Sequence, residues 1–132
     1  MTFYEKEILR IRTLCFSNVK QTETVISTRT YIDNNFDKEL NLNFLSYIRF
    51  TSKFHLLRLF KKYYGLTPKQ YLITKRINES KKLLENGMGV TESCYLVGFE
   101  TPSSFSTLFK SRTGLTPSEY QKKSNFHKVN HN

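Results

Sequence analysis

Hydrophobic side chains recur every three or four positions along most of this chain, which is the spacing of one face of an α-helix. Series of this kind are Leu42, Leu45 and Ile48; Leu56, Leu59 and Phe60; Ile73, Ile77 and Leu84; and Phe105, Leu108 and Phe109. No segment sustains the alternation of a half-buried strand. The pattern therefore predicts an all-α fold, with helices near residues 23–36, 42–49, 53–64, 68–86, 90–97, 102–112 and 117–123.

The two ends of the chain have weaker patterns. Ile8, Ile11 and Leu14 predict one more, separate helix near the start. The last nine residues, SNFHKVNHN at 124–132, show no periodicity, and we expect them to form a disordered tail.

Two Gly-Leu-Thr-Pro stretches, at 65–68 and 114–117, divide the helical pattern. Gly is suited to ending a helix, because it adopts the left-handed conformation at no steric cost. Thr can cap the start of the next helix, and Pro is tolerated as its first residue, where no N–H is needed. Each stretch therefore predicts a helix, a tight stop and a new helix.

These two stretches belong to a longer repeat. Residues 60–71 read FKKYYGLTPKQY and residues 109–120 read FKSRTGLTPSEY, at an offset of 49 positions. Upstream, Leu56 aligns with Phe105 at the same offset, and Leu42 aligns with Val90 at an offset of 48. Each copy has a short helix, a turn and a second amphipathic helix, the outline of a helix-turn-helix unit.

The repeat predicts two helix-turn-helix subdomains joined by a long linker helix. The expected order is an N-terminal helical extension or linker at 1–30, the first subdomain at 31–66, the linker helix at 67–86, the second subdomain at 87–123 and the tail at 124–132. A helix over 68–86 would span roughly 28 Å, and successive major-groove faces of DNA recur about every 34 Å. One chain could therefore present both second helices to one side of a duplex.

The charge distribution supports a polyanionic partner. The chain has 21 Lys and Arg against 11 Asp and Glu, a formal net charge of +10. Between residues 49 and 82 there is one acid, Glu79, and ten bases: Arg49, Lys53, Arg58, Lys61, Lys62, Lys69, Lys75, Arg76, Lys81 and Lys82. This clustering is typical of nucleic-acid binding, although a solvated helix face rich in Lys gives a similar pattern.

Other classes of function have little support in the sequence. His55, His127 and His131 have no partner at a spacing that builds a nucleophile and a base, so we expect no catalytic residues. Cys15 and Cys94 lie far apart and outside any metal-ligand pattern, so we expect no metal and no cofactor, and each cysteine is predicted to be buried. The charged start of the chain does not suit a signal peptide, and no apolar run is long enough for a membrane, which predicts a cytoplasmic protein.

The second helix of each unit has an outward face suited to DNA. Inward burial of Leu56, Leu59 and Phe60 would leave Lys53, Phe54, Leu57, Arg58 and Lys61 outside, and the second copy would expose Pro102, Ser103, Ser106, Thr107 and Lys110. Arg can hold guanine O6 and N7 with two hydrogen bonds, and an apolar side chain can meet a thymine methyl group. The first of these two helices is therefore predicted to be the stronger reader of bases.

The chain from about Tyr31 to Lys122 resembles the DNA-binding domain of the AraC/XylS transcription regulators. The motifs that carry the resemblance are SKFHLLRLFKKYYGLTPKQYL at 52–72, KRINESKKLL at 75–84 and VGFETPSSFSTLFKSRTGLTPSEY at 97–120. The family implies two helix-turn-helix units, sequence-specific binding to double-stranded DNA at promoters, and activation through contact with RNA polymerase. We take RNA polymerase as a candidate second partner.

The resemblance also implies roles for particular residues. Base contacts fall on Phe54, Leu57, Arg58, Ser103, Ser104, Ser106 and Thr107. Contacts to the DNA backbone are expected at Lys53, His55, Lys61, Lys62, Thr67, Lys69, Lys110 and Thr116.

Among the positions that depart from the family pattern, three bear most on structure and function. Phe50 stands where the first turn often has Gly, so a bulky residue would be held at positive φ. Ser93 replaces a large apolar residue and is expected to loosen the core of the second unit. Thr107 stands where some members have Arg, which weakens the case for base reading by the second unit.

Two alternatives to a complete promoter-binding activator stay open. The chain can be the DNA-binding fragment of a larger sensor regulator, or a helical protein-binding module that contacts DNA only nonspecifically. The 30 residues before Tyr31 are too few for a ligand-sensing domain, so we expect no small-molecule ligand within this chain. The lack of a long apolar run also predicts no membrane partner.

Overall fold

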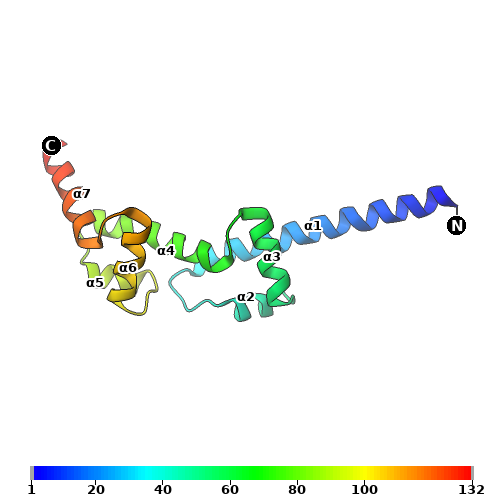
Figure 1. Cartoon of the computed structure of the whole chain (residues 1–132), viewed down its shortest axis with the longest axis horizontal. Helices are drawn as coiled ribbons and strands as arrows, with labels where there is room; N and C mark the ends of the chain where they lie inside the picture. The colour runs from blue at the N-terminus through cyan, green and yellow to red at the C-terminus, as the bar shows by residue number, and fades with distance from the viewer. Residues whose placement is uncertain (1, 132) are drawn as a thin grey trace. The chain divides into compact units, whose positions relative to one another are not determined.

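The computed structural model describes residues 2–131, apart from the side chains at 16, 130 and 131, and its described part is helical without strands (Figure 1). The helices are α1 (Phe3–Asn35), α2 (Leu42–Ile48), α3 (Lys53–Tyr64), α4 (Pro68–Glu85), α5 (Val90–Leu96), α6 (Pro102–Thr113) and α7 (Pro117–His131). The predicted all-α fold is confirmed, with two helix-turn-helix units, α2–α3 and α5–α6.

The chain divides into two compact units. Unit 1 comprises the residues up to Asn34 together with Leu40–Gln70, and unit 2 comprises Asn35–Glu39 and the residues from Tyr71 onward. The boundary after Gln70 falls inside α4, so most of the predicted linker helix belongs to the packing of unit 2.

The start of the chain forms one helix instead of the two that were predicted. Helix α1 has 33 residues and contains neither Gly nor Pro, so no local signal stops it between its two apolar series. Val25, Thr28 and Ile32 near its end are buried, whereas Cys15 is exposed. The prediction that both cysteines are buried is therefore wrong for Cys15 and confirmed for Cys94.

In unit 1, contacts from α1 hold the first helix-turn-helix in place. The Tyr31 and Phe44 ring centroids are 5.9 Å apart, and the Arg29 guanidinium lies 5.5 Å from the Tyr64 ring centroid. The side chain of Arg49 donates to the Ser27 carbonyl at 3.2 Å. Leu45 from α2 and Leu56, Leu59 and Phe60 from α3 are buried, as the periodicity predicts.

Unit 2 has a core rich in aromatic residues. The core contains Ile77, Leu84, Cys94, Val97, Phe99, Phe105 and Phe109. The Phe105 ring packs against Phe99 at 5.2 Å and Phe109 at 5.6 Å between centroids, and Phe109 packs against Tyr120 at 5.3 Å. The positions that align in the repeat, Leu56 with Phe105 and Phe60 with Phe109, are buried in both units.

The predicted disordered tail is helical instead, because α7 continues to His131; Asn132 lies outside the described residues. Its second turn is fixed by Gln121, whose amide donates to the carbonyls of Leu84 at 3.0 Å and Met88 at 2.6 Å. The segment after Tyr120 has no Gly or Pro, and adding a residue to an existing helix is far easier than starting one. Absence of hydrophobic periodicity was therefore a poor sign of disorder here.

The two turns differ at one aligned position. Phe50 has φ 52° and is 97% exposed, and it is the one non-glycine residue at positive φ among the described residues. The aligned Gly98 has φ 100°, and a Cβ there would lie 2.9 Å from the Phe36 carbonyl oxygen. Position 98 therefore requires glycine both because of its positive φ and because a side chain would not fit. Position 50 has room for a side chain, so Phe50 carries only the strain of its positive φ.

Ser93 places a small polar side chain in the core of unit 2, where the aligned Leu45 places a large apolar one in unit 1. Its side chain is fully buried, and its Oγ has no hydrogen-bond partner among the described residues. Ser80, also fully buried, donates to the Ile77 carbonyl at 2.7 Å. Ser93 therefore buries a hydroxyl in an apolar core without a hydrogen bond to offset the cost of removing it from water.

We expect Phe50→Gly to raise the free energy of unfolding by up to about 1 kcal/mol, because relief of the left-handed strain exceeds the added freedom of glycine in the unfolded chain. Urea denaturation followed by circular dichroism measures the change. The converse substitution, Gly98→Ala, should be clearly destabilising, because it adds a close contact to the same strain. An equal response at both positions would contradict this account.

We expect Ser93→Ala to stabilise the protein by about 1 kcal/mol, because it removes a buried hydroxyl that has no partner. Ser80→Ala is the matched control, since it removes a hydroxyl that does have a partner and should be neutral or destabilising. Thermal unfolding of the two variants in parallel separates these outcomes. A loss of stability in Ser93→Ala would show that this hydroxyl has a partner in solution.

Candidate nucleic-acid interface

Helix α3 is positioned by local chemistry at both of its ends. The Ser52 hydroxyl accepts from the His55 N–H at 3.1 Å and caps the start of the helix. Gly65, at φ 72°, ends it with a hydrogen bond from its N–H to the Lys61 carbonyl at 2.8 Å. Burial of Leu56 and Phe60 then sets the rotation of the helix about its axis.

The predicted reading face of α3 is open to solvent. Phe54 is 66% exposed, Arg58 and Lys61 are exposed, and Leu57 is half-buried. The Lys53 ammonium group lies 5.4 Å from the Phe54 ring centroid, a cation–π contact beside the start of the helix. Within residues 2–131 the side chains of Arg58 and Lys61 make no hydrogen bond or ion pair. The five N–H donors of the Arg58 guanidinium are therefore available to a ligand.

Helix α6 repeats this geometry with weaker chemistry. The Thr101 hydroxyl accepts from the Ser104 N–H at 3.1 Å, and Gly114 at φ 85° ends the helix. Ser103, Ser104, Thr107 and Lys110 are exposed, and Ser106 is half-buried. Thr107, which aligns with Arg58, donates its hydroxyl to the Ser103 carbonyl at 3.0 Å. The α6 face thus offers short hydroxyls in place of a guanidinium.

Two of the predicted backbone contacts have local structural partners. The Thr67 hydroxyl accepts from the Gln70 N–H at 3.1 Å, and the Gln70 amide oxygen accepts from the Thr67 N–H at 2.9 Å. The Thr116 hydroxyl accepts from the Glu119 N–H at 3.2 Å and donates to the Glu119 carboxylate at 2.9 Å. Both threonines are half-buried. Each therefore serves first to start α4 or α7.

The sequence prediction overlooked Gln70 and Glu119, which complete these caps. Their signal was present, because Thr-x-x-Gln and Thr-x-x-Glu are the spacing of a capping box. The remaining predicted backbone contacts lie at the surface: Lys53, Lys61, Lys62, Lys69 and Lys110 are exposed, and His55 is half-buried.

The cations of α3 and α6 form none of the ion pairs that the structure shows. Arg10–Glu7, Lys75–Glu79 and Lys82–Glu79 form ion pairs, and none of these three involves α3 or α6. An exposed, unpaired cluster of cations attracts a polyanion and loses this attraction as salt increases.

A family model described as a helix-turn-helix domain matches residues 49–123, which is more than half of the chain and contains α3 to α6. This chain belongs to the AraC/XylS family of transcription regulators. The AraC/XylS resemblance that the sequence motifs indicated is therefore confirmed, with its two-unit DNA-binding fold.

Two curated relatives in this family match long stretches of the chain. The probable transcriptional regulator LumQ of Photobacterium leiognathi is 30% identical over 122 residues, which cover 92% of this chain and 44% of LumQ. The bifunctional transcriptional activator/DNA repair enzyme AdaA of Bacillus subtilis is 36% identical over 95 residues, which cover 71% of this chain and 45% of AdaA. This AraC/XylS chain thus spans less than half the length of these relatives.

Solved structures share the fold. The C-terminal domain of AraT, a response regulator from Geobacillus stearothermophilus, has a TM-score of 0.74 and 27% identity, covering 76% of this chain and 84% of that domain. The DNA-binding domain of AdpA, solved in complex with a target DNA, has a TM-score of 0.76 and 22% identity, covering 80% of this chain and 96% of that domain. At 22% identity, the AdpA likeness establishes the shared fold alone.

Two further observations concern the described part of this AraC/XylS chain. None of its helices combines the length and apolar character needed to cross a membrane. Nor do its His, Cys, Asp and Glu side chains gather in a group of three or more that could hold a metal ion.

Proposed function

We propose that this AraC/XylS regulator binds double-stranded DNA in a sequence-specific manner, with α3 and α6 entering successive major-groove faces. The observation that carries the proposal is Arg58, which is exposed and unpaired on the outward face of α3. Bidentate recognition of guanine needs such a guanidinium. The fold it shares with the AdpA domain, which was solved in complex with a target DNA, adds support.

The two units would contribute unequally. Phe54, Leu57 and Arg58 give α3 an apolar surface for thymine methyl groups and a fork for guanine. Ser103, Ser106 and Thr107 can bond to several base edges or to phosphates, so they discriminate less. We assign most of the sequence preference to α3, and most of the orientation on the duplex to α6 and the surrounding lysines.

The lysines act through charge and set the strength of binding rather than its preference. We expect the exposed Lys53, Lys61, Lys62, Lys69 and Lys110 to contact phosphates, together with the half-buried His55. Thr67 and Thr116 contribute mainly by capping the starts of α4 and α7. Lys69 lies in the first turn of α4.

We also propose that the regulator acts as an activator at bacterial promoters, in the cytoplasm, with RNA polymerase as its second partner. Support comes from the AdaA relative, whose name describes a transcriptional activator, and from the family pattern of the motifs. The proposed role is binding rather than catalysis, because the match covers 45% of AdaA and the matching region is the helix-turn-helix part. The matches cover less than half of LumQ and of AdaA, which also fits a DNA-binding fragment of a larger sensor regulator.

Selection of bound sequences from a randomised duplex pool, at near-physiological salt, tests this proposal. Salt is fixed because nonspecific binding to phosphates otherwise hides the preference. We expect two enriched elements with centres about one DNA turn apart. One element would restrict base reading to α3, and no enrichment would favour the protein-binding module that contacts DNA nonspecifically.

We expect Arg58→Lys to weaken binding to the selected site by about 1–3 kcal/mol and to relax the preference at one base pair. Lysine keeps the charge but loses the two-pronged hydrogen bond, so binding to random DNA should change little. Fluorescence anisotropy with both duplexes measures the difference. Arg12→Lys, at an exposed position of α1, is the matched control. An unchanged preference in Arg58→Lys would reduce Arg58 to a phosphate contact.

A further inference from the structure

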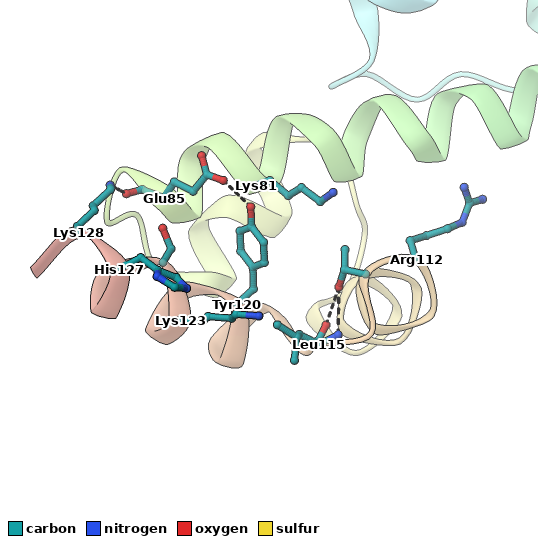
Figure 2. A pocket seen from close by; sticks show the side chains of 10 residues that line it. Lys81, Glu85, Arg112, Leu115, Tyr120, Lys123, His127 and Lys128 are labelled. Atoms are coloured by element: carbon teal, nitrogen blue, oxygen red, sulfur yellow. Dashed lines mark hydrogen bonds between the residues drawn. The ribbon is translucent and has the colours of Figure 1, made fainter. Parts of the chain in front are cut away.

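A pocket of about 860 Å³ lies in unit 2, where its lining residues come from α4, from the end of α6 and from α7 (Figure 2). Figure 2 shows the Tyr120 ring between Lys81 on α4 and Lys123 on α7, with Arg112 on α6 farther along, beyond Leu115. Its volume is in the range of pockets that hold small molecules. The sequence predicted no ligand site at this place.

The pocket is strongly cationic. Lys81, Arg112, Lys123 and Lys128 line it, against a single carboxylate, Glu85. Within residues 2–131 the ammonium groups of Lys81 and Lys123 have no hydrogen bond or ion pair. Arg112 donates to the Thr74 hydroxyl at 2.9 Å through one of its nitrogens, which leaves its other donors for a ligand.

The lone carboxylate of the pocket is already engaged. The Tyr120 hydroxyl donates to Glu85 Oε1, and the Lys128 ammonium group contacts the Glu85 carbonyl oxygen. Burial and the neighbouring carboxylate raise the pKa of Tyr120 to about 12, so this hydroxyl stays protonated and continues to donate. Glu85 keeps its charge, but four cations line the pocket against it, so the net charge of the pocket is positive.

The wall of the pocket is partly apolar. Leu115 and the Tyr120 ring line it, and Tyr120 is braced from behind by Phe109 at 5.3 Å between ring centroids. Thr113 fixes the turn at Leu115, whose N–H donates to the Thr113 hydroxyl at 3.2 Å. A ligand with a flat or apolar body would find a rigid surface here.

The DNA-reading face does not include this pocket. Arg112 is nine positions from Ser103, which at about 100° per residue places it about 180° around α6. Lys110, on the same outward face as Ser103, is likewise about 160° from Arg112. A duplex held by the outward face of α6 would therefore leave Arg112 unused.

We propose that this pocket binds a small organic anion that carries a phosphate group on an apolar or aromatic body. Lys81 and Lys123 would hold the phosphate through their ammonium groups, and Arg112 would add positive charge to the same pocket. The Tyr120 ring and Leu115 would contact the body of the ligand. This site is independent of the DNA-reading residues and differs from the expectation that the chain holds no small-molecule ligand.

Titration of the isotope-labelled full chain with 1-naphthyl phosphate, followed by amide chemical shifts, tests the proposal. We expect saturable shifts at Lys81–Glu85 and Arg112–Lys128, and weaker binding of inorganic phosphate, which lacks the apolar body. The variant Lys81→Glu/Lys123→Glu should lose at least about tenfold in affinity, because it changes the pocket's charge by four. Its affinity for duplex DNA should stay within about twofold of that of a control variant that carries the same change of net charge on α1.

The matched control is Lys6→Glu/Lys20→Glu on the exposed part of α1, which changes the net charge equally. Equal loss of binding in both variants would reduce the effect to overall charge and overturn the proposal. Shifts confined to α3 and the outward face of α6 would overturn it in favour of nonspecific phosphate binding. Binding of hexaglutamate without binding of 1-naphthyl phosphate would assign the pocket to an acidic protein segment instead.

Discussion

Burial of one apolar face by each of α3 and α6, the second helices of the two helix-turn-helix units, is the constraint on which the remaining structure depends. Leu56 and Phe60 in α3, and Phe105 and Phe109 in α6, are fully removed from water, each contributing about 2–3 kcal/mol. A helix has only one rotation that buries such a pair. Arg58 in one unit and Thr107 in the other are thereby directed outward. The buried core residues of α3 and α6 thus decide which of their side chains face outward.

The same interaction explains why the junctions after these helices are so alike. Each reading helix must end where its core face ends, and the next helix must begin within a few residues. Gly65 and Gly114 end the helices in the left-handed conformation, and Thr67 and Thr116 start the next ones with side-chain caps. The repeated Gly-Leu-Thr-Pro motif is therefore a structural device, and its threonines are occupied by their own helices.

The repeat has diverged where its two copies have different neighbours. Gly98 approaches the backbone of Phe36 and Asp37 and has no space for a side chain, whereas Phe50 stands clear of the protein. Ser93 leaves an unsatisfied hydroxyl in unit 2 at the position of Leu45 in unit 1. Arg58 offers five donors where Thr107 offers a hydroxyl that bonds to its own helix. Unit 1 keeps the better core in α2 and an exposed guanidinium on α3, and unit 2 adds a cationic pocket.

The sequence alone determined the helical fold, the repeat, the buried faces and the outward position of Arg58. These features follow from periodicity, caps and glycine stops, which act over about four residues and can be read locally. It also marked Phe50 and Ser93 as irregular. The sequence wrongly predicted two separate helices within α1 and a disordered tail. A weak hydrophobic pattern does not end a helix that contains no Gly or Pro. Only the tertiary structure decided that Gly98 has no space, that Glu85 is engaged by Tyr120, and that Lys81, Arg112 and Lys123 surround one pocket. Those residues lie 31 and 11 positions apart along the chain, and packing, rather than any local rule, brings them together.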